Sequence, residues 1–250
     1  MDSIVFLGTA GARFTVFRQI RASGGIWITL SDTQILLDPG PGALVKCLKN
    51  RSQLDPTKLD GIILSHRHLD HSADVNTMIE AMTQGGSRPR GVVFAPKDAL
   101  EQDPVIFQYV RKYVNRVEIL REGGEYKLKD IKFKTPVRHQ HSAETYGINF
   151  FGGKNTISYI ADTKYFQGLE SYYKGDTLII NVVRLEPSDI EHLCLKDAKR
   201  IILLNKPKLA ILTHFGMTMI KAKPWELAAN IQKEFGIEVR AASDGMRIEL

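Results

Sequence analysis

Cysteine is scarce in this chain of 250 residues, which contains only Cys47 and Cys194. Two cysteines cannot build a thiolate metal cluster or a framework of several disulfides, so the disulfide-rich secreted class is excluded. Long apolar runs are also missing, because no stretch approaches the roughly 20 residues that a membrane-spanning helix needs. The start, Met1–Val5, has no basic segment followed by an apolar stretch. We therefore expect no signal peptide, no membrane association, and a cytoplasmic protein with reduced thiols.

Neither charge sign dominates the chain. Lys and Arg total 34 and Asp and Glu total 28, which leaves a net charge of +6. This mild excess is compatible with an anionic substrate. Hydrophobic residues make up 43% and charged residues 25%, as in ordinary globular proteins. Since repeats, low-complexity tracts and long polar linkers are absent from the sequence, we expect residues 1–250 to form a single domain.

Short apolar runs bounded by turn residues alternate with amphipathic segments. We predict strands at 3–7, 25–30, 34–38, 61–65, 92–95, 117–120, 125–128, 131–136, 145–151, 156–161, 177–183, 209–213, 238–242 and 246–249. We predict helices at 43–50, 73–82, 104–115, 195–205 and 225–235. The turns at 31–33 and 152–155 predict hairpins, and the three strands within 117–136 alternate like antiparallel strands. Two mixed sheets packed face to face, with helices outside, fit this α+β order better than a barrel or a doubly wound sheet.

The positions of the histidines are the strongest indication of a functional site in this sequence. Residues 65–71 read Ser-His-Arg-His-Leu-Asp-His, directly after an apolar strand. In an extended segment His66 and His68 point to the same side and together can bind one metal. Asp70 and His71 follow a turn at the start of a helix and can face a second metal. These side chains suit zinc, and also manganese or iron. Four such residues within six positions argue against an incidental polar turn.

Three further ligand-type residues lie beside predicted strands. His141 precedes the strand 145–151, Asp162 follows 156–161, and His214 follows 209–213. Each alone also fits a simpler explanation, as a loop residue, a cap or a strand-end histidine. Because a metal site needs ligands from several segments, these three are the candidates to complete one.

Together these residues resemble the metallo-β-lactamase fold superfamily of metal-dependent hydrolases. Its five motifs occur in order: Asp38 in Leu-Leu-Asp-Pro-Gly, the His-x-His-x-Asp-His run, His141, Asp162 and His214. The opening at 6–11, Phe-Leu-Gly-Thr-Ala-Gly, and the His-x-x-x-x-Tyr-Gly step at 141–147 are similar to the ribonuclease Z-like branch, and the ending at 243–250 is common in the superfamily. That branch includes tRNA 3′-processing nucleases and small phosphodiesterases. The resemblance implies an αββα sandwich.

Carried over residue by residue, the resemblance implies a site for two divalent metals. The first metal would be held by His66, His68 and His141, the second by Asp70, His71 and His214, and Asp162 would bridge them. A carboxylate between two cations offsets their charge at the spacing of roughly 3.5–4 Å that two-metal hydrolases use. Asp38 would orient a ligand through a hydrogen bond. The alternative for Asp38 is a turn residue before Pro39.

Two more histidines need separate consideration. His192 lies 22 residues before His214. In the ribonuclease Z-like branch a histidine at about this spacing faces the substrate phosphate. The resemblance therefore implies Asp70 and His192 as catalytic residues, with a surface histidine near a helix start as the alternative for His192. His139 is the rival of His141 for the first metal. The step to Gly147 favours His141 and leaves the part of His139 open.

The implied reaction is metal-assisted phosphodiester hydrolysis. Two cations would lower the pKa of a bridging water and polarise a phosphoryl oxygen, while His192 could hold an oxygen or help the leaving alcohol depart. Secreted β-lactam hydrolases would carry an export signal, and the di-iron oxygen-handling branch replaces the residue at His68 with an acid. Glyoxalase-type thioester hydrolases continue with glycine where this chain has Ser72. A catalytically idle scaffold that binds RNA or a partner typically loses ligands, and all seven are present here.

The lengths of the segments between the motifs indicate the size of the substrate. Ribonuclease Z enzymes grip tRNA with a long arm, which one-domain forms insert between the third-motif histidine and the bridging aspartate. Here the step from His141 to Asp162 is only 21 residues and is filled by two predicted strands. The stretch 71–141 is occupied by predicted helices and strands. We expect a small phosphodiester, with cyclic phosphates among the candidates. An RNA-processing nuclease is the alternative, and the sequence leaves a homodimer open.

Overall fold

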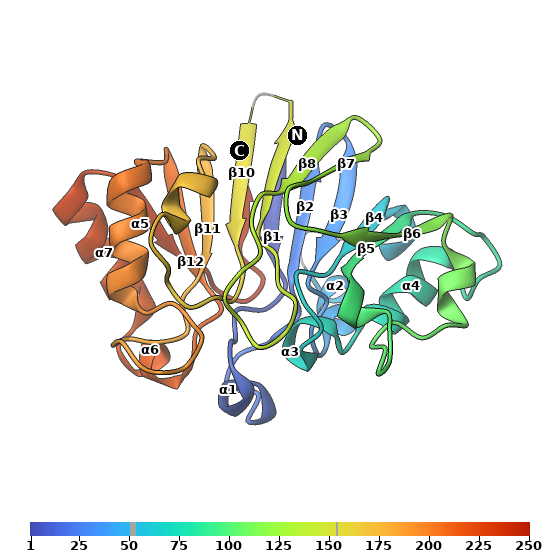
Figure 1. Cartoon of the computed structure of the whole chain (residues 1–250), viewed down its shortest axis with the longest axis horizontal. Helices are drawn as coiled ribbons and strands as arrows, with labels where there is room; N and C mark the ends of the chain where they lie inside the picture. The colour runs from blue at the N-terminus through green and yellow to red at the C-terminus, as the bar shows by residue number, and fades with distance from the viewer. Residues whose placement is uncertain (51–53, 154) are drawn as a thin grey trace.

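The computed structural model describes residues 1–50, 54–153 and 155–250, and their strands form two mixed seven-stranded sheets (Figure 1). The first sheet has the order β14 (Arg247–Glu249), β1 (Ser3–Phe6), β2 (Ile26–Leu30), β3 (Thr33–Leu37), β4 (Gly61–Ile63), β5 (Val92–Pro96), β6 (Arg116–Leu120). The second has the order β13 (Glu238–Ala241), β12 (Leu209–Thr213), β11 (Thr177–Asn181), β10 (Asn155–Ile160), β9 (Ile148–Gly152), β8 (Ile131–Thr135), β7 (Gly124–Leu128).

Each sheet is antiparallel in one half and parallel in the other. In the first sheet the run from β14 to β3 is antiparallel and the run from β3 to β6 is parallel. In the second, β7 to β10 are antiparallel and β10 to β13 are parallel. The two predicted hairpins form as β2–β3 and β9–β10, although Lys154 in the second turn lies outside the described residues.

Helices cover the outer faces of both sheets (Figure 1). The α-helices are α1 (Arg13–Phe17), α2 (Ala43–Leu48), α3 (Leu69–Ser72), α4 (Val75–Thr83), α5 (Leu195–Asn205), α6 (Met217–Lys221) and α7 (Pro224–Phe235). Short 3₁₀ turns lie at Pro56–Lys58, Lys97–Ala99, Val110–Tyr113 and Leu169–Tyr172. Helices α2 and α4 pack on the first sheet, and α5 and α7 pack on the second. The predicted αββα sandwich is therefore confirmed. None of the described helices combines the length and apolar character needed to cross a bilayer.

Strand β1 shows why apolar runs appear in this sequence without alternation. Ile4 and Phe6 point into the core between the two sheets, whereas Val5 and the following Leu7 point toward α2 and α4. Because successive side chains of a strand face opposite ways, a strand covered on both faces needs apolar residues at every position. That the whole chain forms a single domain stays a prediction.

One predicted helix is wrong. Residues 104–115 form an irregular segment with a single 3₁₀ turn at Val110–Tyr113. Ile106, Val110 and Val114 are buried against the first sheet, and their four-residue spacing imitates a helical period. The Arg111 guanidinium donates to the carbonyl oxygens of Leu100 and Ile106 at 2.7 Å each. These side-chain contacts stabilise the irregular path.

The region 117–136 also differs from the prediction. Strand β6 pairs with β5 in parallel in the first sheet, while β7 and β8 form an antiparallel hairpin in the second. The chain therefore crosses between the sheets at residues 121–123. The five-residue helices α1 and α6 were not predicted, because neither is long enough to show a period. Helix α1 projects from the body of the fold on the side where α3 and α6 lie (Figure 1).

Candidate metal centre

The predicted ligands all follow strands that end at one edge of the sandwich. Asp38 follows β3, the 66–71 run follows β4, Asp162 follows β10, and His214 follows β12. The carboxyl ends of parallel strands meet at one edge of a sheet, which is where sites in such folds form. The loop between β8 and β9 brings His141 to the same edge, and the connection between β11 and α5 brings His192.

The seven predicted metal ligands gather into groups with converging donor atoms. One group contains His66, His68 and His141, and a second contains Asp70, His71, Asp162 and His214. A third contains His141, Asp162 and His192. Within each group the donor atoms lie within 4.8 Å of one another. The structure thus brings together the two sets that the resemblance implies, and it places Asp162 where the sets meet.

Distances in the second group fit a metal ion. His71 Nε2 lies 3.2 Å from His214 Nε2 and 3.5 Å from Asp162 Oδ2. His214 Nε2 lies 3.3 Å from Asp162 Oδ2 and 3.6 Å from Asp70 Oδ2, while His71 Nε2 to Asp70 Oδ2 is 3.9 Å. A tetrahedral zinc ion with ligand bonds of 2.0–2.1 Å sets neighbouring donor atoms roughly 3.3 Å apart. The set therefore needs little movement to hold such an ion.

The first group offers imidazole lone pairs. His66 Nε2 is buried without a hydrogen-bond partner, and its Nδ1 lies 3.0 Å from Ser65 Oγ. Ser65 Oγ donates its single proton to Asp38 Oδ2 at 2.7 Å, so it accepts from His66 Nδ1. This bond leaves Nε2 unprotonated. His141 Nδ1 donates to the carbonyl of Glu191 at 3.0 Å, and its Nε2 lies 3.1 Å from His68 Nδ1.

Asp38 and Asp162 are linked through a buried hydrogen-bond network. Asp38 Oδ2 accepts from His71 Nδ1 at 3.0 Å and from Tyr159 Oη at 2.8 Å. Asn181 Nδ2 donates to Tyr159 Oη at 3.0 Å and to Asp162 Oδ1 at 2.8 Å. Sequence reasoning missed Tyr159 and Asn181. The available signal was a polar side chain inside an otherwise apolar strand.

His139 lies outside all three groups of donor atoms. Its Nδ1 donates to the carbonyl of Asp162 at 3.2 Å, and its Nε2 accepts from Tyr173 Oη at 2.7 Å. Burial lowers the pKa of His139 to about 4. Because both ring nitrogens are engaged, His139 packs behind Asp162 and has no lone pair to offer a metal. The choice between His139 and His141 is therefore decided by the hydrogen bonds.

Burial and neighbouring charge divide the histidines by protonation. Burial lowers the pKa of His66 well below its usual value and lowers the pKa of His68 and His141 as well, so these three are neutral near pH 7. Burial also opposes a charge on His71, but Asp38 and Asp162 outweigh it and hold its pKa well above the usual value. A cation that binds His71 must therefore displace a proton from its ring.

Backbone conformation at this edge is unusual. Asp38 and His214 have φ values of 52° and 58°, which non-glycine residues seldom adopt. Gly11 lies against His214, because a β-carbon at that position would be 2.5 Å from His214 Cδ2 and 2.2 Å from its carbonyl oxygen. Such local strain persists where the surrounding structure holds it, often at functional sites.

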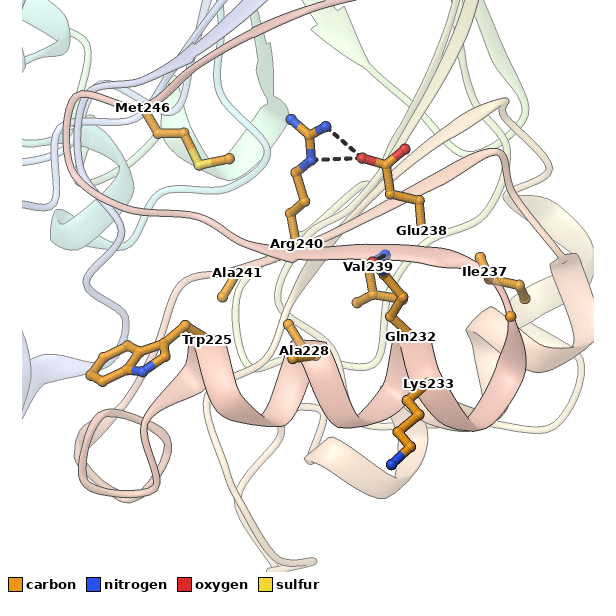
Figure 2. A pocket seen from close by; sticks show the side chains of 12 residues that line it. Trp225, Ala228, Gln232, Lys233, Ile237, Glu238, Val239, Arg240, Ala241 and Met246 are labelled. Atoms are coloured by element: carbon orange, nitrogen blue, oxygen red, sulfur yellow. Dashed lines mark hydrogen bonds and ion pairs between the residues drawn. The ribbon is translucent and has the colours of Figure 1, made fainter.

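A separate concavity lies away from the histidines. A groove of about 810 Å³ runs between α7 and β13, where Trp225, Gln232 and Val239 line it and Glu238 pairs with Arg240 (Figure 2). It contains none of the predicted ligands. A small cavity of about 20 Å³ lies instead at the candidate metal centre, where Asp38, Asp70, His71 and His214 line it.

Comparison with known proteins agrees with this arrangement. The family described as the beta-lactamase superfamily domain matches residues 33–215. The chain is 32% identical over 260 residues to the protein MJ1374 of Methanocaldococcus jannaschii, covering 99% of this chain and 94% of that one.

Solved structures show the same fold. The Bacillus subtilis metallo-β-lactamase fold protein YhfI is 21% identical with a TM-score of 0.83, covering 100% of this chain and 99% of that one. A diphosphatase from the PhnP family is 19% identical with a TM-score of 0.72, covering 100% and 98%. The short form of human tRNase Z is 17% identical with a TM-score of 0.71, covering 99% and 98%. The chain belongs to the beta-lactamase superfamily, with the metallo-β-lactamase fold and a His/Asp cluster able to bind metal.

Proposed function

We propose that this protein is a dinuclear metal-dependent phosphodiesterase that hydrolyses small or cyclic phosphodiesters. The observation that supports it most is the position of Asp162. Its carboxylate shares one group of donor atoms with Asp70, His71 and His214, and another with His141 and His192. A carboxylate between two ligand sets is what a pair of cations in one site requires.

In this proposal His66, His68 and His141 hold one metal, Asp70, His71 and His214 hold the other, and Asp162 contacts both. Two bound cations would outweigh the two carboxylates in charge, polarise a phosphoryl oxygen and lower the pKa of a water molecule. The orphaned lone pair on buried His66 Nε2 supports metal binding on this chain's own geometry. We propose zinc, with manganese or iron as alternatives, because imidazole and carboxylate donors suit all three.

Asp70 and His192 are the residues that we propose act on the substrate. The Asp70 side chain is 13% exposed, against 2% for Asp162, so it is the more accessible of the two carboxylates. It can accept a proton from the attacking water. His192 Nε2 lies 3.2 Å from Asp162 Oδ2, and its side chain is 15% exposed. Burial opposes a charge on His192, but Asp162 raises its pKa. His192 can therefore donate a proton to the leaving oxygen.

The fold supports a small substrate. Strands β9 and β10 account for most of the step from His141 to Asp162, and the residues described there include no inserted arm. Between His71 and His141 the chain forms α4 and four strands of the two sheets. Without an arm, binding of tRNA would depend on the net charge of +6, and such contacts are sensitive to salt and do not specify one RNA. A cytoplasmic location and a homodimer stay predictions.

The test combines metal analysis with a substrate panel at physiological salt. Metal-replete protein is assayed on bis-p-nitrophenyl phosphate, cyclic nucleotides and a precursor tRNA. D162N should lose metal and activity together. D176N is the matched control, because Asp176 binds Thr156 and Lys208 away from the donor groups.

Two metals per chain with turnover of the small esters is the expected result. Accurate trimming of a precursor-tRNA trailer with little turnover of small esters would favour the ribonuclease Z type. Bound metal with no hydrolysis of any substrate would favour a binding scaffold.

A further inference from the structure

The segment at residues 97–103, which follows β5, supplies none of the donor atoms that are grouped in the described part of the chain. Strand β5 pairs in parallel with β4, so this segment emerges at the edge of the sandwich where the 66–71 run also emerges. It makes hydrogen bonds to both segments that carry the first group of ligands, His66, His68 and His141. The segment therefore borders the candidate metal centre without supplying a ligand to it.

Asp98 and Glu144 are joined by two reciprocal hydrogen bonds. The Glu144 N–H donates to Asp98 Oδ2 at 3.0 Å, and the Asp98 N–H donates to Glu144 Oε2 at 3.3 Å. Glu144 Oε1 accepts from Tyr146 Oη at 2.8 Å, and the Tyr146 N–H donates to the carbonyl of Ser65 at 3.1 Å. Because Glu144 lies three residues after His141, these bonds fix the loop that presents His141 against the ends of β4 and β5.

Arg67 lies between His66 and His68, and its guanidinium bonds to the same segment. It donates to the carbonyl of Asp98 at 3.4 Å, and to the carbonyl and Oδ2 of Asp103 at 3.1 Å and 3.0 Å. The Asp103 side chain is 94% exposed, so this ion pair contributes little. Asp98 is partly buried, and its carboxylate bonds to the backbone of the other ligand-bearing segment. Of the two acidic residues, Asp98 is therefore the one that connects the two segments.

The Asp98 carboxylate serves as a hydrogen-bond acceptor rather than as a charge. Its second oxygen, Oδ1, is buried without a partner among the described residues. Burial raises the pKa of Asp98, so the surroundings disfavour its negative charge. An uncharged side chain with an oxygen at the same position could therefore accept the bond from the Glu144 N–H.

We propose that Asp98 is a positioning residue that holds His141 in place for the first metal ion. It acts through the backbone of Glu144, which it fastens to the end of β5. The second group of ligands is supported from Asp38, which accepts from His71 Nδ1. Loss of Asp98 should therefore weaken binding of the first ion selectively. The inference rests on the proposed two-metal function and deepens it, because it separates the residues that support the two ions.

The test measures the affinity of each site for Zn²⁺ by competition with a chromophoric chelator, and mass spectrometry counts the metals per chain. D98A should weaken binding of the first ion by roughly 10-fold, the low end for residues behind metal ligands, because Asp98 acts through the backbone. D98N should bind as the wild type does, because its amide oxygen accepts the same bond. D55A is the matched control, because Asp55 also accepts a backbone N–H, from Thr57 at 3.0 Å, and belongs to none of the donor groups.

A second background assigns the effect to one ion. H141A removes a ligand of the first ion and should leave the second ion bound. Adding D98A to H141A should then leave the affinity for the remaining ion unchanged, because both substitutions act on the same site. Co²⁺-substituted protein gives an independent readout, since the visible absorption of D98A should differ from that of the wild type and D98N should match it. D98L fills the space of the side chain without an acceptor, and it replaces D98A if the alanine variant melts much lower than the wild type.

The outcomes separate this inference from the proposed function. Two metals bound by D98A with wild-type affinity would overturn the inference, as would an equal loss in the H141A background or a loss in D98N as large as that in D98A. Wild-type protein that binds fewer than two metals would refute the two-metal site and this inference with it. Wild-type protein that binds two metals but hydrolyses no phosphodiester would contradict the proposed function alone and leave the positioning by Asp98 intact.

Discussion

Replacing Asp38 with asparagine tests how far metal binding depends on a side chain behind the ligands. Asp38 is 4% exposed and accepts four hydrogen bonds. They come from Ser65 N at 2.6 Å, Ser65 Oγ at 2.7 Å, Tyr159 Oη at 2.8 Å and His71 Nδ1 at 3.0 Å. The last bond keeps a proton on His71 Nδ1, so Nε2, which faces Asp162 and His214, is the atom that gives up its proton when a metal binds. D38N keeps the size of the side chain and places an NH₂ group where only donors meet it.

The loss can be worked out from the two orientations of the amide. If Nδ2 replaces Oδ2, it opposes the donors from Ser65, Tyr159 and His71, and the histidine must move its proton to Nε2. If the amide is turned, only the Ser65 N–H loses its partner. Both orientations break at least one bond to a buried group. Comparable changes behind metal ligands cost 10- to 100-fold in affinity, which is about 1.4–2.7 kcal/mol. We expect D38N to fall in this range.

The assay is competition for Zn²⁺ with a chromophoric chelator, with the metals per chain counted by mass spectrometry. D74N is the control, because Asp74 Oδ2 accepts from Leu44 N at 3.1 Å and belongs to none of the donor groups. Y159F removes one donor to Asp38 and should have a smaller effect than D38N. Two metals bound by D38N with the affinity of the wild type would refute the argument that Asp38 sets the proton position on His71.

Three further predictions follow from the same structure. H192A should keep both metals and slow phosphodiester hydrolysis by roughly 10²–10⁴; full turnover would show that His192 is structural. G11A should lower metal affinity, because its β-carbon would collide with His214, whereas G85A, at φ 66° with nothing within 4 Å, should strain the backbone and keep the metals; equal metal binding by both would contradict this. Burial raises the pKa of Cys47 to about 12, so Ellman's reagent at pH 8 should label it only after unfolding; rapid labelling of the native protein would show that the thiol is accessible.

Local sequence patterns predicted the helices and motifs whose structure depends on residues close together in the chain. The 195–205 helix has the predicted ends, because its apolar positions recur at helical spacing over three turns. The ligand run 66–71 could be recognised because His66, His68, Asp70 and His71 are close in sequence and follow an apolar strand. The order of the motifs along the chain indicated the fold through its resemblance to the metallo-β-lactamase superfamily.

Only the tertiary structure decided which residues act together. Periodicity favoured a helix at 104–115, but burial of three apolar residues and the bonds of Arg111 stabilise an irregular path. His139 and His141 are indistinguishable by residue type, and they differ because Tyr173 and the Asp162 backbone engage both nitrogens of His139. Hydrogen bonds between residues far apart in sequence depend on how the two sheets pack. A local sequence pattern does not indicate that packing.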